Sequence, residues 1–469
     1  MSAAAVAAVV AAARGTVPPR WAPLLSAMAK SGSGAVASGL LAALANKLVA
    51  ATAGPPAVAV LATLQQMRQA ALLVATGNGR TALIQGACAL EGQRRREFLR
   101  TAMVCFSGAT ALAALALLGA PPGVARWMGL PAGGEVLLRW MVVPLAASVV
   151  FVYASALLGA LGQVGRLAAV QTAAALVMVC GAWPAALAAR SGRLESLVFL
   201  ISAAASASAL LALVMLWRLR HASREWWSGP GRWWSGDAVR HLFSISGALL
   251  ATGCVASWSV LYVRSRITAA QGLEVTGQFD AAWAISMNQV SLVLASLQTY
   301  AFPMLAKART GEARAEQLAR LLTVAPLCAA LAIVILALGK LPVLSLLYSS
   351  AFHPAALYLR WTLLGDYLKV TSWILSLAML AAANVRAFAL ADLAAYGVFI
   401  TAACVLARWV GAAESAAIAF VTMYAVHAGI CAGYVRRTHG LRFRSQAVTA
   451  WFAGLAVVTG VTAWTWGVA

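Results

Sequence analysis

An arginine and two glutamines share one face of a long apolar stretch. Arg68 lies 12 residues into the apolar run 56–76, about 18 Å along a helix that rises 1.5 Å per residue. Gln65 and Gln69 fall within about 100° of Arg68 around such a helix, whereas Gln66 points elsewhere. A charge at that depth usually faces a cavity or a partner. The spacing favours a cationic, polar cavity lining, and the alternative is an arginine that pairs with a carboxylate only for packing.

A second charged pair lies far along the chain. Asp366 and Lys369 are three residues apart, so they share one helix face, again near the middle of an apolar run. They either neutralise each other or act separately. In the functional interpretation, Lys369 attracts an anionic head group while Asp366 takes up a proton or a cation.

Three further polar residues are candidates. Arg80 follows a Gly-Asn-Gly turn, and its long stem either lines the cavity or extends to the membrane interface. Asp280 opens the apolar run 281–302, as an ion-coupling group or as an interfacial carboxylate. Asn288 adds polar lining to the same run.

Other charged residues have simpler interpretations. Arg386 and Asp392 are expected to form an interface pair, and Lys47 is expected to anchor the outer edge of its span.

The motifs of several enzyme classes are missing from the sequence. It contains no G-x-x-x-x-G-K-[ST] loop, no C-x-x-C pair and no histidine spacing typical of a metal site. We therefore predict no cofactor, no metal and no catalytic residues. The links expected outside the membrane are short, whereas a membrane glycan polymerase or ligase needs a sizeable loop to hold its acid/base group. This favours transport over catalysis.

The elements that position these residues follow from composition. The chain has 469 residues, of which 62% are hydrophobic and only 10% charged. A helix crosses the hydrocarbon layer in about 20 residues, and backbone amides in lipid must be paired within a helix or a closed barrel. The long apolar runs lack the alternation of barrel strands, so we expect an all-α integral membrane protein. Twelve spans are expected at 34–53, 56–76, 101–120, 140–161, 167–187, 197–217, 242–263, 281–302, 321–338, 361–382, 393–407 and 416–434.

The basic residues orient these spans. The chain carries 35 Lys and Arg against 13 Asp and Glu, scattered through short loops rather than gathered on a nucleic-acid-binding face. More than twice as many lie on the side of the amino terminus as on the other. The positive-inside rule therefore predicts a cytoplasmic amino terminus.

The predicted organisation has five parts. They are an extension at 1–30, a six-helix bundle at 31–218, a cytoplasmic linker at 219–240, a second six-helix bundle at 241–437, and an extension at 438–469 with a possible thirteenth helix. The linker contains four tryptophans among basic residues, which suggests an amphipathic segment on the inner leaflet. Six plus six spans suggest two bundles around a central cavity.

Several stretches together resemble a known family. The sequence is similar to the Wzx-type translocases of O-antigen and enterobacterial common antigen, within the multidrug/oligosaccharidyl-lipid/polysaccharide exporter superfamily. The resemblance covers about residues 22–437. It rests on residues 346–352, 364–369 and 385–388 with Asp392, on Gly54-Pro55 and Asn78-Gly79, and on residues 300–305.

This resemblance implies a function. Such a protein flips an undecaprenyl-pyrophosphate-linked oligosaccharide across the bacterial inner membrane by alternating access, in some cases beside a polysaccharide polymerase. Arg68, Lys369 and Arg80 would then attract the pyrophosphate, while Gln65, Gln69 and Asn288 would contact sugars. Coupling would rest on Asp280 or Asp366, because Met287 stands where relatives can carry an acid. The alternatives are a drug or cation antiporter of the same superfamily and a membrane glycan polymerase or ligase.

Overall fold

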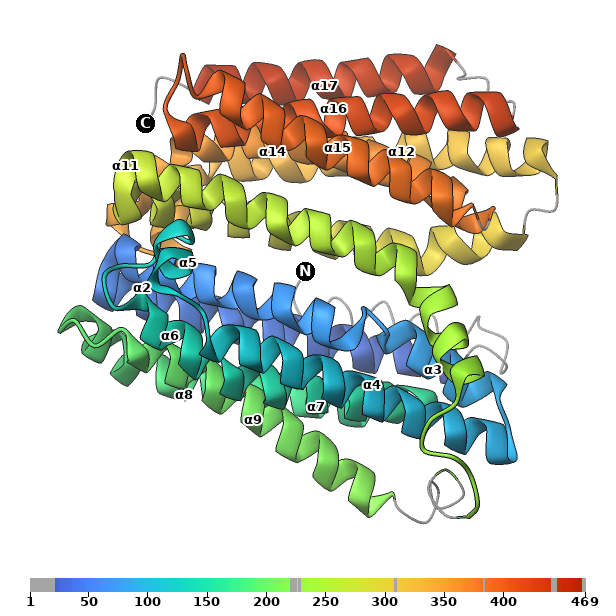
Figure 1. Cartoon of the computed structure of the whole chain (residues 1–469). Coiled ribbons are helices and arrows are strands. Elements are labelled where there is room, and N and C mark those ends of the chain that lie inside the picture. The colour runs from blue at the N-terminus through green and yellow to red at the C-terminus, as the bar shows by residue number, and fades with distance from the viewer. Residues whose placement is uncertain are drawn as a thin grey trace.

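The computed structural model describes residues 22–219, 226, 229–307, 310–382, 384–439 and 445–465, and within these ranges the chain is helical without a strand. Figure 1 shows two layers of helices, with blue to green elements in one layer and yellow-green to red elements in the other. The first layer contains α2 (Ala22–Thr76), α3 (Arg80–Ala89), α4 (Gly92–Leu118), α5 (Pro122–Trp127), α6 (Gly134–Trp140), α7 (Val142–Ala160), α8 (Val164–Arg190) and α9 (Glu195–Arg218).

The second layer begins with the longest helix. It contains α11 (Gly236–Lys307), α12 (Gly311–Leu338), α13 (Lys340–Leu347), the 3-10 helix η2 (Ser350–Ala355), α14 (Ala356–Ala381), α15 (Val385–Leu406), α16 (Ala412–His439) and α17 (Ser445–Trp464). Ten helices of the described chain are long and apolar enough to cross a membrane. The protein is therefore a multi-pass membrane protein, as the composition predicts.

The helix α11 is a hairpin of two spans. Gly272 interrupts it with φ 83°, a left-handed value that favours glycine. Arg264 and Asp280 form an ion pair across this point, although 16 residues of straight helix would separate them by about 24 Å. Thr268 and Thr276 are joined by a hydrogen bond of 2.9 Å between their hydroxyls. The chain thus reverses at Gly272.

The helix α2 is divided in the same way. Gly54 has φ 75° and is followed by two prolines. Ala42 and Gln66 line the same cavity, although 24 residues of straight helix would place them about 36 Å apart. Counting both hairpins as two spans makes the ten helices consistent with the twelve predicted spans, arranged as two bundles.

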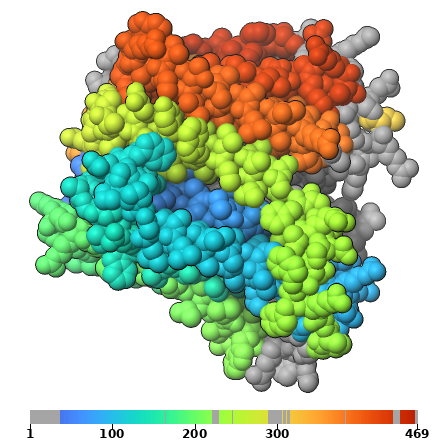
Figure 2. All heavy atoms as spheres, viewed as in Figure 1, coloured from blue at the N-terminus to red at the C-terminus, as the bar shows by residue number. Residues whose placement is uncertain are grey.

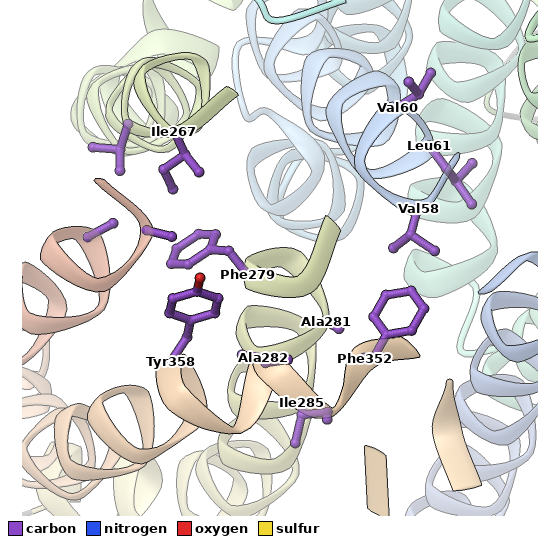
Figure 3. Close-up of a cluster of buried hydrophobic side chains, with 14 of the residues drawn as sticks. Val58, Val60, Leu61, Ile267, Phe279, Ala281, Ala282, Ile285, Phe352 and Tyr358 are labelled. Atoms are coloured by element: carbon purple, nitrogen blue, oxygen red, sulfur yellow. The ribbon is translucent and has the colours of Figure 1, made fainter. Parts of the chain in front are cut away.

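The two hairpin turns touch each other. A Cβ atom at Gly277 would overlap the carbonyl oxygen of Pro55, so the backbones of α11 and α2 meet where no side chain fits. Figure 3 shows the adjoining apolar cluster, in which Val58 of α2 and Phe352 of η2 lie close to α11. The cores of the two bundles are therefore continuous at this end of the molecule.

Helical structure also extends beyond the predicted spans. The stretch between the predicted spans 56–76 and 101–120 is mostly helix, because it forms α3 and the first turns of α4. The described part of the linker lies on α4. There Arg96 donates to the carbonyl of Pro230 at 3.1 Å and Arg100 to that of Gly231 at 2.7 Å.

The last helix packs on the second bundle. α17 contacts α12 and α14. The Tyr367 hydroxyl donates to the carbonyl of Trp451 at 2.7 Å, and the Trp451 indole donates to the Thr371 hydroxyl at 2.9 Å. The C-terminal extension thus forms a helix that is attached through side-chain hydrogen bonds, and its crossing of the membrane stays a prediction. The domain boundaries themselves remain a prediction.

Candidate functional site

A polar cavity of about 690 Å³ lies between the first bundle and the hairpin α11. We call it the central chamber. Figure 2 shows its surroundings, with α2 in blue between α11 in yellow-green and the cyan helices of the first bundle. Its polar and charged lining residues are Asn46, Gln65, Gln66, Arg68, Gln69, Ser148, Gln171, Ser208, Arg264 and Asp280. Such a lining offers hydrogen-bonding groups of the kind that a sugar or a phosphate needs.

Arg68 reaches the chamber as the sequence predicts. Its guanidinium donates to the hydroxyl of Ser148 at 2.8 Å, and that hydroxyl donates in turn to the carbonyl of Pro144 at 2.6 Å. Its Nε has no hydrogen-bond partner among the described residues. A guanidinium has five donors, so this group is oriented by one hydroxyl and retains donors for a ligand.

The chamber covers a wider arc of α2 than we expected. Gln65 and Gln69 line it as predicted, but Gln66 lines it too, and the prediction that Gln66 points elsewhere is wrong. At 100° per residue, the lining positions from Arg68 to Gln66 span about 160° of the helix. Arg68 lies at one edge of this arc, because the chamber wraps around the helix instead of touching one narrow stripe.

The carboxylate of Asp280 is paired with Arg264. The two side chains form a buried ion pair, and Arg264 also donates to the carbonyl of Ala59 on α2 at 3.4 Å. Asp280 therefore lies in the chamber wall. The sequence analysis did not single out Arg264 and missed this pair. The sequence does contain one indication of this pair, because both residues stand eight positions from the turn at Gly272.

The formal charge of the described chamber wall is positive. Arg68 and Arg264 contribute two positive charges and Asp280 one negative charge. Because Asp280 and Arg264 neutralise each other, the remaining charge is that of Arg68. The chamber thus favours an anion.

Lys369 lies one residue away from the chamber. Its ammonium is 3.1 Å from the sulfur of Met287, which itself lines the chamber. It also lies over the rings of Phe420 and Tyr424, 5.9 and 5.8 Å from their centres. Lys369 does not belong to the described chamber wall. No contact among the described residues therefore supports the prediction that it joins Arg68 there.

Asp366 is fully buried, with 0% of its surface exposed. Its carboxylate oxygens accept no hydrogen bond within 3.5 Å from the described residues. It lies within electrostatic range of Lys369, on the same face of α14 as the sequence predicts. No direct ion pair joins the two among the described residues.

Two other predicted residues do not contribute to the described chamber. Arg80 is exposed at the first position of α3 and is not part of the lining. The side chain of Asn288 lies outside the described residues, so its role remains a prediction.

Asp392 has a different partner from the expected one. Its carboxylate lies 3.2 Å from Nε2 of His427 on α16, whereas we expected Arg386 as its partner. Arg386 is the second residue of α15 and is exposed. His427 is only 5% exposed. The sequence analysis missed this residue, because nothing in the spacing along the chain connects α15 with α16.

Lys47 joins the two bundles. Its ammonium donates to the carbonyls of Ser345 at 3.1 Å and Leu346 at 2.6 Å, in the last turn of α13. The last carbonyls of a helix are unpaired within the helix and carry partial negative charge, so a lysine is well placed there. The expected outer-edge anchor is thus a bridge between α2 and α13.

An aromatic residue forms part of the chamber wall. Trp283 lines the chamber and packs edge-on against Phe420, with ring centres 5.0 Å apart. Its ring centre also lies 5.7 Å from that of Phe279.

A second cavity, of about 330 Å³, lies between α12, α14, α16 and α17. It is lined almost wholly by apolar side chains and offers nothing to a charged group.

Comparison with known proteins shows the fold. No family model and no curated protein sequence matches the chain. Solved structures do match. The lipid II flippase MurJ in an inward closed conformation has a TM-score of 0.70 at 11% identity, covering 93% of this chain and 98% of that chain.

Transporters of a second group match as well. An inward-facing multidrug resistance MATE family transporter of the MOP superfamily has a TM-score of 0.65 at 16% identity over 85% of this chain and 94% of that chain. MATE in complex with MaL6 has a TM-score of 0.66 at 14% identity over 88% of this chain and 96% of that chain. The chain therefore has the fold of MOP-superfamily transporters and flippases.

Proposed function

We propose that this protein is a flippase for an undecaprenyl-pyrophosphate-linked oligosaccharide in the bacterial inner membrane. The observation that carries the proposal is the guanidinium of Arg68, which lies in the central chamber and is bonded to Ser148 and to no carboxylate of the described part of the chain. A diphosphate is the anionic part of such a substrate. Arginine matches phosphate oxygens in a bidentate geometry.

The remaining chamber wall suits a glycan. Gln65, Gln66, Gln69 and Gln171 offer amide donors and acceptors, and the ring of Trp283 offers an apolar surface. The lipid chain would stay in the bilayer while its head group occupies the chamber. The lipid II flippase MurJ shares this fold, and this likeness supports a lipid-linked substrate.

The best alternative is a drug or cation antiporter, since MATE transporters share the fold. That function needs an acidic chamber. Here Asp280 is the one carboxylate of the described chamber wall, and it is already paired with Arg264. The charge of the chamber therefore favours the flippase over the antiporter.

The testing experiment is deletion of the gene followed by analysis of lipid-linked glycans. We expect undecaprenyl-linked repeat units to accumulate on the cytoplasmic face, because their exit requires the chamber. Complementation with the native chain should clear them and complementation with Arg68→Glu should not, since a carboxylate there repels a diphosphate. Unchanged glycans with altered drug tolerance would instead establish the antiporter.

A further inference from the structure

Several amide side chains line the central chamber without a hydrogen-bond partner among the described residues. They lie on both arms of α2 and on α8, and they are Asn46, Gln65, Gln66, Gln69 and Gln171. Buried and half-buried polar groups in proteins are normally satisfied by protein, water or a ligand. These amides are therefore available to whatever occupies the chamber.

The arrangement of the amides suits a sugar. An amide carries a donor and an acceptor side by side, and a sugar hydroxyl both donates and accepts, so the two groups complement each other. Gln65 and Gln69 are separated by about one turn of α2. Gln171 lines the chamber from α8, which packs against α2. Amides thus reach the same space from two helices.

The size of the chamber allows sugars to enter it together with a diphosphate. Its volume is about 690 Å³, within the range of pockets that enclose a drug-sized ligand. A diphosphate beside Arg68 leaves room along the amides of α2 and α8. The chamber therefore selects among glycans as well as binding the diphosphate.

The positive charge of the described wall is already needed by the diphosphate. A diphosphate that joins a lipid to a sugar is charged on both phosphates, whereas the described wall has one uncompensated positive charge, that of Arg68. Arg264 is neutralised by Asp280. Residues 288–306, which continue the same hairpin, contain no charged residue. An acidic group on the glycan thus meets no unpaired cation in the described wall.

Lys369 does not supply this cation. Its ammonium contacts the sulfur of Met287 at 3.1 Å and does not line the chamber itself. It also lies within electrostatic range of Asp366, whose negative charge offsets its own. A buried carboxylate without a partner is costly, so the chamber disfavours an acidic sugar.

We propose that the part of the glycan that enters the central chamber is uncharged, and that the amides of Gln65, Gln69 and Gln171 bind its hydroxyl groups. The inference rests on the proposed function, because it concerns the glycan attached to the diphosphate. A neutral sugar is accepted because its hydroxyls meet amides. An acidic sugar is rejected because its carboxylate stays unpaired in the described wall.

The first experiment compares two ligands that differ in one group. Undecaprenyl-pyrophosphate-linked disaccharides that end in glucose or in glucuronic acid are titrated calorimetrically against the full chain in mixed micelles. The two sugars differ only in a hydroxymethyl group that is a carboxylate in glucuronic acid. We expect the ligand with glucuronic acid to bind at least about tenfold more weakly, because a charged group left unpaired costs more than a neutral one.

The second experiment adds the missing cation to the wall. In Gln171→Arg the ratio of the two affinities should approach one, because arginine pairs with a carboxylate in a bidentate geometry. Ser191→Arg is the matched control, since it adds the same charge at the exposed C-cap of α8 and should leave the ratio unchanged.

A third variant tests the amide itself. Gln171→Leu should weaken binding of the ligand that ends in glucose about two- to tenfold, as expected for the loss of a hydrogen bond. The loss should be larger than for undecaprenyl pyrophosphate, which has no sugar. Equal losses for the two ligands would overturn the role of this amide in sugar binding.

The outcomes separate the inference from the proposed function. Equal affinity of the native chain for the two disaccharide ligands overturns the uncharged glycan and leaves the flippase in place. A ratio that does not change in Gln171→Arg also overturns the inference, because the charge of the wall then does not determine the choice of sugar. A native chain that binds neither disaccharide ligand nor undecaprenyl pyrophosphate overturns the proposed function and the inference with it.

Discussion

Removal of the negative charge at Asp280 distinguishes a structural carboxylate from a transported-ion site. Asp280→Asn leaves the Arg264 guanidinium in the wall with its remaining described acceptor, the Ala59 carbonyl at 3.4 Å. Breaking a buried ion pair by removing one partner costs about 3–5 kcal/mol. The side chains are 8% and 4% exposed, so solvent screens this pair little and the full range applies.

Removal of both charges should cost less than removal of one. In Asp280→Asn with Arg264→Gln, no uncompensated charge is left, and replacement of a whole buried pair is often close to neutral. We therefore expect the double variant to recover most of the 3–5 kcal/mol. The hairpin at Gly272 gives the pair its structural role, because the two side chains hold the arms of α11 together.

The assay is equilibrium unfolding of the purified protein in mixed micelles, with the four members of the double-mutant cycle compared at one pH. Arg320→Gln is a suitable control, since it breaks the exposed pair with Glu316 and should change stability by less than about 1 kcal/mol. If Asp280→Asn is as stable as the native chain but loses transport, Asp280 is an ion-coupling group and the structural reasoning is refuted.

Three further tests address the chamber and the contact between the bundles. Arg68→Ala should weaken binding of undecaprenyl pyrophosphate about 10- to 150-fold, from a loss of about 1.5–3 kcal/mol for a charge-assisted hydrogen bond. Arg68→Lys should retain part of the affinity, and equal binding by the alanine variant in a calorimetric titration would exclude this residue from the site. Gly277→Ala should force the hairpins apart at Pro55, which should appear as a longer distance between spin labels on α2 and α11. Gly397→Ala on α15, where a Cβ has open space, should leave that distance unchanged. Lys47→Met should increase the rate of cysteine labelling at Asn46→Cys in the chamber by severalfold, because the bridge to α13 is lost. An unchanged labelling rate would show that the bridge does not control access to the chamber.

The sequence predicted the elements of the fold because they depend on local properties. Apolar runs of about 20 residues specify membrane helices without any tertiary information, and the glycine before two prolines at Gly54 marks a turn. The place of Arg68 in a cavity wall follows from the sequence for a similar reason, since its depth and its neighbours on one helix face are properties of a single helix, and its role in binding stays a prediction.

Pairings between helices were predicted poorly. Arg264 was not singled out as the partner of Asp280, and Asp392 was paired with Arg386 instead of His427. Both contacts depend on how helices fold back or pack. Two ionisable residues that are 16 or more positions apart have no spacing rule unless the turn between them is known. Gly272 was such a turn, and its role became clear only from the backbone.

The contacts at the hairpin end limit how the proposed translocation can occur. Opening the bundles there would expose Val58 and Phe352, which are 8% and 0% exposed, at about 1.5–3 kcal/mol for each side chain. It would also break the bonds of Lys47 to α13, at about 1.5–3 kcal/mol. A ligand shifts a conformational equilibrium only by its difference in affinity for the two states, and one arginine–phosphate contact provides about the same amount as a single one of these losses. The head group at Arg68 is therefore too weak a driving force by itself, and opening at this end of the molecule requires a further source of free energy.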